Sequence, residues 1–520
     1  MAKDKFLRGA MILTLAGLVV KIIGSFNRII LSRFLGGEGI GLYQMAYPMY
    51  LLILAIAAAG IPTAISIIVS ELLAKGDRGN VKRVFKVSLR LMACVGLVLA
   101  VLLLVAAKVL LVTGIIQDGR AYYAIVALIP AVFFATILAS FRGFFQGHQL
   151  MAPPAISQIL EQLVRVLVMV VLAYLLLPLG LEYAAAGAAF GTVPGSITGL
   201  LVLGYFYRRY RSTWMEEGVG CSYEPERAGS IVKRLLCLAL PVSLANVLVP
   251  VSNIVDMLMV PNRLVASGFT VEQATTLYGY LTGMAQPLIM LATIPTLSLT
   301  ASLVPAVREA YTLEKTEDVN RKAHLAMKLC CLITVPAAVG MMVFAEQISL
   351  LLYGTAKAAL AIRHSGLAVW LLGTQQITSG ILQGIKETKG PMTNMFVGIL
   401  VKIAAVYFLT NAAWNIAGAA WATNINFAVT ALLNIWLLRR AHISFKGWEI
   451  VKIVVASLLM GAVGSFCYPL LAASLNPLMA NSLVLLLAAG SYVLLLPLLH
   501  IVTREELEQL PLWNKFFRKA

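Results

Sequence analysis

The sequence predicts an all-helical membrane protein with about fourteen transmembrane helices. Hydrophobic residues make up 60% of the 520 residues, charged residues make up 12%, and the mean hydropathy is +0.88. A soluble domain has roughly 45–50% apolar and about 25% charged residues. The composition therefore excludes a soluble globular protein and a disordered chain. The apolar segments are long and nearly continuous, unlike the alternating segments of about ten residues that build an outer-membrane barrel.

The individual spans follow from the apolar runs and from the charged or turn-forming residues between them. The first run follows Lys3, Lys5 and Arg8 and has no A-x-A cleavage site after it, so we expect an uncleaved first helix. The expected spans are 10–35, 40–73, 82–112, 119–146, 154–177, 182–207, 232–261, 273–306, 322–346, 358–385, 391–413, 415–438, 447–473 and 476–502. An even number of spans places both termini on one side of the membrane.

The positions of the cations predict which side that is. With a cytoplasmic N-terminus, the inner loops and helix ends hold 31 of the 41 Lys and Arg residues, the outer side holds six, and four lie within spans. This positive-inside bias is typical of an inner-membrane protein. It accounts for the net charge of +18 without a nucleic-acid partner. We expect both termini to be cytoplasmic, with the amphipathic tail 503–520 along the inner surface. A frayed, solvated end is the alternative for this tail.

Three short motifs recur in the same order at nearly constant spacing, which indicates an internal duplication. The pairs are Gly60–Thr63 with Thr293–Thr296, Gln146–Gly147 with Gln383–Gly384, and Ala186–Phe190 with Ala417–Trp421. Each copy has six spans, so the copies are expected as parallel repeats related by an axis along the membrane normal. The predicted parts are an N-terminal lobe 1–207, a cytoplasmic loop 208–231, a C-terminal lobe 232–440 and two further helices in 441–502.

Helix packing is predicted at one position within the first lobe. Gly187, Gly191, Gly195 and Gly199 recur every four residues in the span 182–207. Such a ridge of small residues is typical of close contact between transmembrane helices. We interpret it as a packing surface rather than as a binding site.

Four cations lie within spans: Lys21, Arg28, Arg165 and Lys402. Each costs about 2.5–3.5 kcal/mol at the centre of a helix on insertion scales, so such residues are expected to face a polar interior. Arg165 and Lys402 are separated by the repeat spacing, which predicts equivalent depth in the two lobes. An excess of cations in a central cavity favours an anionic ligand, and a pyrophosphate fits. These four residues are therefore the candidate substrate-binding residues.

Polar neighbours supply candidate cavity or coupling-ion residues. Ser25 shares a helix face with Lys21 and Arg28, and Glu161 lies four residues before Arg165, where the two can pair. Asn253 and Asp256 lie in the span 232–261. No metal-binding, ATPase or cofactor motif occurs in the sequence, and a coupling ion, Na⁺ or H⁺, stays open.

Structural alternatives exist for each of these charges. Arg165 could serve only as the partner of Glu161, and Asp256 as the partner of one of the cations. Arg28 and Lys402 could instead extend towards lipid headgroups.

Longer motifs resemble a known family. The runs 142–147 (RGFFQG), 153–166 (PPAISQILEQLVRV) and 256–264 (DMLMVPNRL) resemble the stage V sporulation protein B family. That family is part of the multidrug, oligosaccharidyl-lipid and polysaccharide exporter superfamily, and MurJ-type lipid II flippases are its relatives. The resemblance covers nearly the whole chain.

The resemblance implies a two-lobed, fourteen-helix flippase for polyprenyl-pyrophosphate-linked sugars, working in peptidoglycan or spore-cortex synthesis. It also implies that the lipid tail lies against 441–502. MurJ-like proteins carry functionally important arginines in helix 1, in the pattern Arg-x-x-Gly-x-x-Arg-Asp. Here Lys21 replaces the first arginine and Arg28 is displaced by one position. The MurJ-like cations of helices 2 and 8 have no counterpart in 51–60 or 281–292.

The expected partners are the lipid bilayer and a lipid-linked anionic glycan. Three alternatives remain: a flippase for another lipid-linked polysaccharide unit, a cation-coupled multidrug exporter, and a scaffold that recruits cell-wall synthesis enzymes. An exporter of cationic drugs needs acidic residues in its cavity, and the excess of intramembrane cations argues against it. The cost of burying those cations argues against a scaffold.

Overall fold

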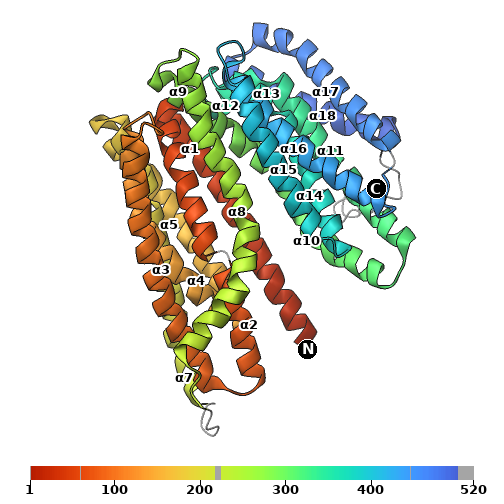
Figure 1. Cartoon of the computed structure of the whole chain (residues 1–520). Helices are drawn as coiled ribbons and strands as arrows, with labels where there is room; N and C mark the ends of the chain where they lie inside the picture. The colour runs from red at the N-terminus through yellow and green to blue at the C-terminus, as the bar shows by residue number, and fades with distance from the viewer. Residues whose placement is uncertain (1, 59, 217–223, 446, 502–520) are drawn as a thin grey trace. The chain divides into compact units, whose positions relative to one another are not determined.

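A computed structural model of the chain describes residues 2–58, 60–216, 224–445 and 447–501, and within these ranges every regular element is a helix (Figure 1). The predicted tail 503–520 and part of the predicted loop 208–231 lie outside the described residues. The first helices are α1 (Ala2–Ala58), α2 (Ile61–Ala74), α3 (Arg78–Val112), α4 (Ala121–Gly147), α5 (Ala152–Leu176), α6 (Leu181–Phe190), α7 (Thr192–Glu216), α8 (Ala228–Ala266) and α9 (Val271–Gly279). They are followed by a π-helical turn (Tyr280–Ala285), α10 (Gln286–Thr312), α11 (Thr316–Val343), α12 (Ala345–Tyr353), α13 (Ala359–Ser365), α14 (Leu367–Gly384), α15 (Lys389–Leu409), α16 (Asn415–Arg440), α17 (Gly447–Ser474) and α18 (Pro477–Leu498).

The helices have the length and composition of membrane spans. Twelve helical stretches among the described residues are long and apolar enough to cross a bilayer. One of them, Met11–Ala74, includes two of the predicted spans, and the predicted span 358–385, built from α13 and α14, is not among the twelve. The protein is therefore a multi-pass, all-helical membrane protein, as predicted. The number fourteen stays a prediction.

The long helix α1 consists of two arms that meet at Gly36. This glycine has φ 65° and ψ −169°, a backbone conformation that residues other than glycine rarely adopt. A straight helix would separate Arg28 and Tyr47 by about 28 Å along its axis. Instead, the guanidinium carbon of Arg28 lies 5.5 Å from the centre of the Tyr47 ring. The second arm of α1 therefore runs back beside the first, which agrees with the two spans predicted before and after this position.

Contacts divide the chain into two compact units, Met1–Met284 and Ala285–Ala520. This division differs from the predicted lobes because α8 and α9 pack against α1. Glycines permit the close approach of α9: a Cβ atom on Gly279 would lie only 1.9 Å from the carbonyl oxygen of Gly37. The side chain of Gln44 also donates a hydrogen bond to the carbonyl of Thr282, at 2.7 Å. The division into lobes of six spans stays a prediction.

Helix boundaries support the predicted duplication. The start of α11 lies 238 residues after that of α3, and the start of α15 lies 237 residues after that of α5. The ends of α4 and α14 are also 237 residues apart. Beyond those ends, Gln149 and Lys386 have positive φ angles of 58° and 73°, again at a spacing of 237. The two halves thus place helices and turns at matching positions.

The second unit includes the two helices that follow the predicted repeat. Helix α17 packs against α11 and α18, and Lys328 of α11 lies 3.3 Å from the carboxylate of Glu449 in α17. The hydroxyl of Tyr492 in α18 donates a hydrogen bond to the carbonyl of Leu332, at 3.0 Å. Polar contacts therefore attach both helices to α11.

The glycine ridge packs as predicted. A Cβ atom on Gly195 would lie 2.9 Å from the Cβ of Arg165 and 2.9 Å from the carbonyl oxygen of Glu161. A Cβ atom on Gly191 would lie 2.8 Å from the backbone nitrogen of Met169. Gly191, which lies between α6 and α7, and Gly195 on α7 therefore let this part of the chain lie directly against the part of α5 that carries Glu161 and Arg165.

We expect Gly195→Val to lower the thermal stability of the protein in detergent by several degrees. The added atoms would meet backbone that cannot move aside, and overpacking of this kind costs about 1–3 kcal/mol. Gly204→Ala on the same helix is the matched control, because a Cβ atom there meets nothing within 4 Å. Equal melting temperatures for the two variants would contradict the packing role of the ridge.

Candidate functional site

Two arginines from different helices lie over one tyrosine ring within the first unit. The guanidinium carbon of Arg28, on the first arm of α1, lies 5.5 Å from the centre of the Tyr47 ring, and that of Arg165, on α5, lies 5.4 Å from it. Both distances are within the range of a cation–π interaction. Arg28 lies eight residues before Gly36, or about 12 Å along the helix. Arg165 is close to the middle of α5, so the arrangement lies deep within the spans.

Hydrogen bonds orient Arg165 further. One of its terminal nitrogens donates to the hydroxyl of Thr192 at 3.0 Å and to the hydroxyl of Tyr47 at 3.3 Å. Thr192 is the first residue of α7 and is 1% exposed. The four residues Arg28, Tyr47, Arg165 and Thr192, here called the Tyr47 cluster, thus join α1, α5 and α7.

Two further tyrosines on the same helix contact the Tyr47 ring. The ring centres of Tyr43 and Tyr47 are 5.5 Å apart, and those of Tyr47 and Tyr50 are 5.9 Å apart. Tyr43 and Tyr50 are each 3% exposed, whereas Tyr47 is half-buried. The tyrosines recur at spacings of four and three residues, which places them on one face of the helix.

The two arginines of the Tyr47 cluster lack carboxylate partners. Within the described part of the chain, neither Arg28 nor Arg165 forms an ion pair, and Arg28 donates no hydrogen bond. A guanidinium carries five N–H donors. The cluster is therefore positively charged and retains donors for an anion.

Glu161 pairs with Arg142 rather than with Arg165, which corrects the expected pairing within α5. The carboxylate of Glu161 lies 2.5 Å from a terminal nitrogen of Arg142 on α4. The two side chains are 18% and 22% exposed, so the pair is mostly buried. The interpretation of Arg165 as merely the partner of Glu161 is therefore wrong, because another arginine takes that position.

The other candidate residues are distributed over both units. Lys21 is exposed and Ser25 is half-buried, both on α1. On α8, Asn253 is half-buried and Asp256 is 1% exposed. Lys402 on α15 is 2% exposed and belongs to the second unit, so its predicted position opposite Arg165 stays a prediction.

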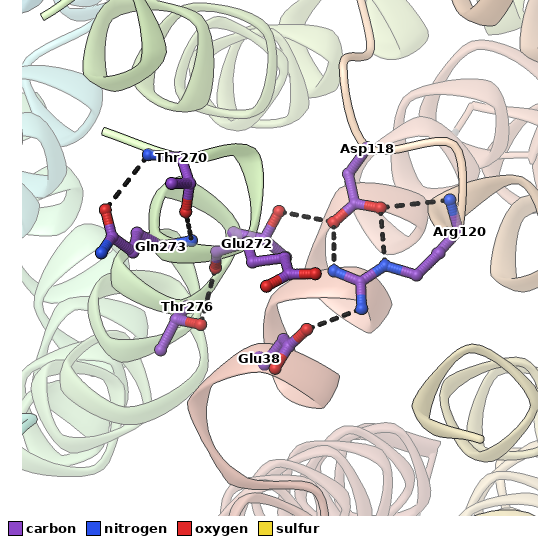
Figure 2. Close-up of polar contacts among 8 residues, drawn as sticks. Glu38, Asp118, Arg120, Thr270, Glu272, Gln273 and Thr276 are labelled. Carbon is purple, nitrogen blue, oxygen red and sulfur yellow. Dashed lines mark hydrogen bonds and ion pairs between the residues drawn. The ribbon is translucent and has the colours of Figure 1, made fainter. Parts of the chain in front are cut away.

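A second charged cluster lies beside the reversal of α1 (Figure 2). Arg120 forms ion pairs with Glu38 at 2.6 Å and with Asp118 at 2.9 Å, and Asp118 also accepts a hydrogen bond from the hydroxyl of Thr275 at 2.8 Å. Its hydrogen bond to Asp118 raises the pKa of Arg120 above the ordinary value. Here every charge has a partner, so the cluster joins α1, α4 and α9 and offers no free cation.

Sequence reasoning missed Tyr47 and the pairing of Arg142. The tyrosine spacing in 43–50 was a usable signal, since it repeats the spacing of Lys21, Ser25 and Arg28 on the preceding span. No local pattern reveals the pair between Arg142 and Glu161, because the two residues lie on different helices.

We expect Arg142→Gln to lower the melting temperature and the folded yield. The change leaves the mostly buried carboxylate of Glu161 without its ion-pair partner, which is more costly than removing both charges. The double variant Arg142→Gln/Glu161→Gln should recover most of the loss. The matched comparison is Arg165→Gln/Glu161→Gln, which should show no such recovery relative to Arg165→Gln. Recovery only in the second pair would contradict the assignment.

Comparisons with known proteins agree with this fold. The family model described as polysaccharide biosynthesis protein matches residues 6–311, and a second model, MatE, matches 241–408. Stage V sporulation protein B of Bacillus subtilis (strain 168) is 31% identical over 514 residues, covering 98% of this chain and 99% of that protein. Lipid II flippase MurJ of the same strain is 25% identical, covering 88% and 87%.

Solved structures show the same fold. A structure of lipid II flippase MurJ in an inward closed conformation has a TM-score of 0.70 at 16% identity, covering 94% of this chain and 99% of that one. An inward-facing multidrug resistance MATE family transporter of the MOP superfamily has a TM-score of 0.68 at 18% identity, covering 81% and 94%. With the helical fold and the sequence similarity together, the chain belongs to the polysaccharide biosynthesis protein family, in the superfamily that includes stage V sporulation protein B, MurJ and the MATE transporters.

Proposed function

We propose that the protein is an alternating-access flippase that exports a polyprenyl-pyrophosphate-linked cell-wall precursor across the inner membrane of a bacterial cell. The precursor resembles lipid II and serves peptidoglycan or spore-cortex synthesis. Similarity to stage V sporulation protein B and to MurJ supports the class of activity. The substrate itself is inferred from the charged residues of the first unit.

The proposal rests on one observation: the guanidinium groups of Arg28 and Arg165 both lie over the Tyr47 ring. Cations within a membrane span are costly unless a partner compensates them. Arg28 and Arg165 have no carboxylate partner in the described structure, so an incoming anion would supply the compensation. Guanidinium groups match the oxygens of a phosphate in geometry as well as in charge. A pyrophosphate is an anion of suitable size and charge that lipid-linked sugars carry.

Transport in this scheme needs no covalent chemistry, so the protein acts as a transporter and not as an enzyme. The headgroup enters from the cytoplasmic side and binds Arg28 and Arg165, with Lys21 and Lys402 as further candidate contacts. The polyprenyl tail stays in the lipid, against the helices of 441–502. The lobes then open outward. Membrane voltage contributes about 2.3 kcal/mol per charge per 100 mV to a cycle that moves net charge.

Coupling to an ion is a separate question within the same scheme. Ser25, Glu161, Asn253 and Asp256 are the candidate residues for Na⁺ or H⁺. Asp256 is 1% exposed and Glu161 is paired with Arg142.

A cation-coupled drug exporter is the second candidate function. The match of the MatE family model to residues 241–408 favours it. The Tyr47 cluster opposes it, since two guanidinium groups would repel a cationic drug. A flippase for another lipid-linked polysaccharide unit would use the same phosphate contacts and would differ only in its headgroup. Recruitment of cell-wall synthesis enzymes is compatible with either flippase.

We expect Arg28→Ala and Arg165→Gln each to reduce export by more than about tenfold at normal membrane levels, because each removes a charge that holds the phosphates. Arg165→Lys should keep part of the activity, since a point charge still attracts phosphate although the planar fork is lost. The readout is extracellular exposure of labelled lipid-linked precursor in a strain that depends on this protein. Lys82→Gln, an exposed cation on α3, is the control. Normal export by both arginine variants would remove the Tyr47 cluster from the transport path.

Cysteine labelling tests the predicted orientation of the protein in the membrane. In a background with the six native cysteines replaced, we expect Glu272→Cys to react with an impermeant thiol reagent in intact cells and Leu313→Cys to react only after permeabilisation. Both positions are exposed, in or next to loops on opposite sides of the predicted topology. The reverse labelling pattern would refute cytoplasmic termini.

A further inference from the structure

We propose that Tyr47 is the positioning residue of the phosphate site: its ring holds the guanidinium groups of Arg28 and Arg165 so that one diphosphate, rather than a monophosphate, engages both. This inference rests on the proposed function and deepens it, because it names the residue that sets the preference between phosphate classes. It concerns residues of the first unit alone.

The geometry gives the ring a direct part in placing both cations. The two guanidinium carbons lie 5.5 and 5.4 Å from the same ring centre, so they can be no further apart than the sum of these distances. Two like charges held this close repel each other. Attraction to the negative face of the ring opposes that repulsion, and it does so without adding a carboxylate that would compete with an anion.

The ring itself is held in place. Tyr43 and Tyr50 contact it along the second arm of α1, and both are almost fully buried. The Tyr47 hydroxyl accepts a hydrogen bond from Arg165, which in turn is fixed by Thr192. Arg28 has no such second contact, so the ring is the contact that the structure gives its guanidinium group. Loss of the ring is therefore expected to release Arg28 more than Arg165.

Selectivity follows from the number of guanidinium groups that one ligand reaches. A diphosphate presents anionic oxygens on two phosphorus atoms and can engage both arginines at once. A monophosphate has oxygens on one phosphorus and gains less from the second arginine. Holding both groups before binding reduces the ordering that the ligand must impose, and this preorganisation benefits the diphosphate more.

Binding of short soluble probes tests the inference directly. Affinities of the purified full-length protein for farnesyl diphosphate and farnesyl monophosphate are measured in detergent by calorimetry. Tyr47→Phe, which keeps the ring, should change diphosphate affinity by less than about threefold. Tyr47→Leu, which removes the ring, should weaken it by about tenfold or more and should change monophosphate affinity much less. Tyr205→Leu, an exposed tyrosine on α7, is the matched control.

A variant of unchanged shape separates positioning from folding. Trifluorinated phenylalanine at position 47 fills nearly the same space as phenylalanine but lacks the negative ring face. It should reproduce the selective loss of diphosphate affinity seen with Tyr47→Leu while the melting temperature stays at the Tyr47→Phe value. Equal diphosphate affinity for phenylalanine and its fluorinated form would overturn the role of the ring, even if Tyr47→Leu failed to fold.

Arginine variants distinguish this failure from a failure of the proposed function. If Arg28→Ala and Arg165→Gln weaken diphosphate binding while the Tyr47 series does not, the phosphate site stands and the positioning role of Tyr47 is wrong. If the arginine variants bind farnesyl diphosphate like the unmodified protein, the phosphate site itself is wrong, and the inference on Tyr47 falls with it.

Discussion

Two guanidinium groups that share one tyrosine ring, deep within the membrane spans, set the main constraint on the first unit of this protein. Placing Arg28 and Arg165 there is costly unless the surroundings compensate the charge. The described structure supplies a ring face and two hydroxyl groups but no carboxylate. Such compensation is partial. Under the proposed function, a bound anion compensates the remaining positive charge.

Backbone features unrelated to charge bring these residues together. The reversal of α1 at Gly36 places Tyr47 beside Arg28, although 19 residues separate them. The glycine ridge, which runs from α6 into α7, allows these helices to lie against α5, and this contact brings Thr192 within reach of Arg165. Close packing of small residues thus holds helices together in the membrane, as burial of apolar side chains does in a soluble core. The neighbouring pair of Arg142 and Glu161 is neutral as a whole and leaves the charge of the Tyr47 cluster unchanged.

The two halves share helix positions but differ in their polar chemistry. At the repeat spacing of 237, Arg142 corresponds to Ser379 and Glu161 corresponds to Gly398. Where the first half has an ion pair, the second half has an amide network: Asn434 donates to Ser379 at 2.9 Å and accepts from Asn394 at 2.8 Å. Arg165 corresponds to Lys402, which is almost fully buried. At the predicted repeat spacing the two halves therefore share a cation at one position, while the polar contacts around it differ.

The sequence by itself determined the membrane class, nearly all the helices and the duplication, because these depend on apolar length, turn residues and spacing along the chain. It also indicated four cations within spans, with Arg28 and Arg165 among them, since a cation within an apolar run is visible without a structure. Only the tertiary structure decided which groups these cations meet. Tyr47 lies on the returning arm of α1, and Glu161 turns to Arg142 on α4 rather than to Arg165 one helical turn away. The physical reason is that the packing of helices far apart in the sequence determines which groups contact a buried charge. The spacing of residues within one helix does not indicate that packing.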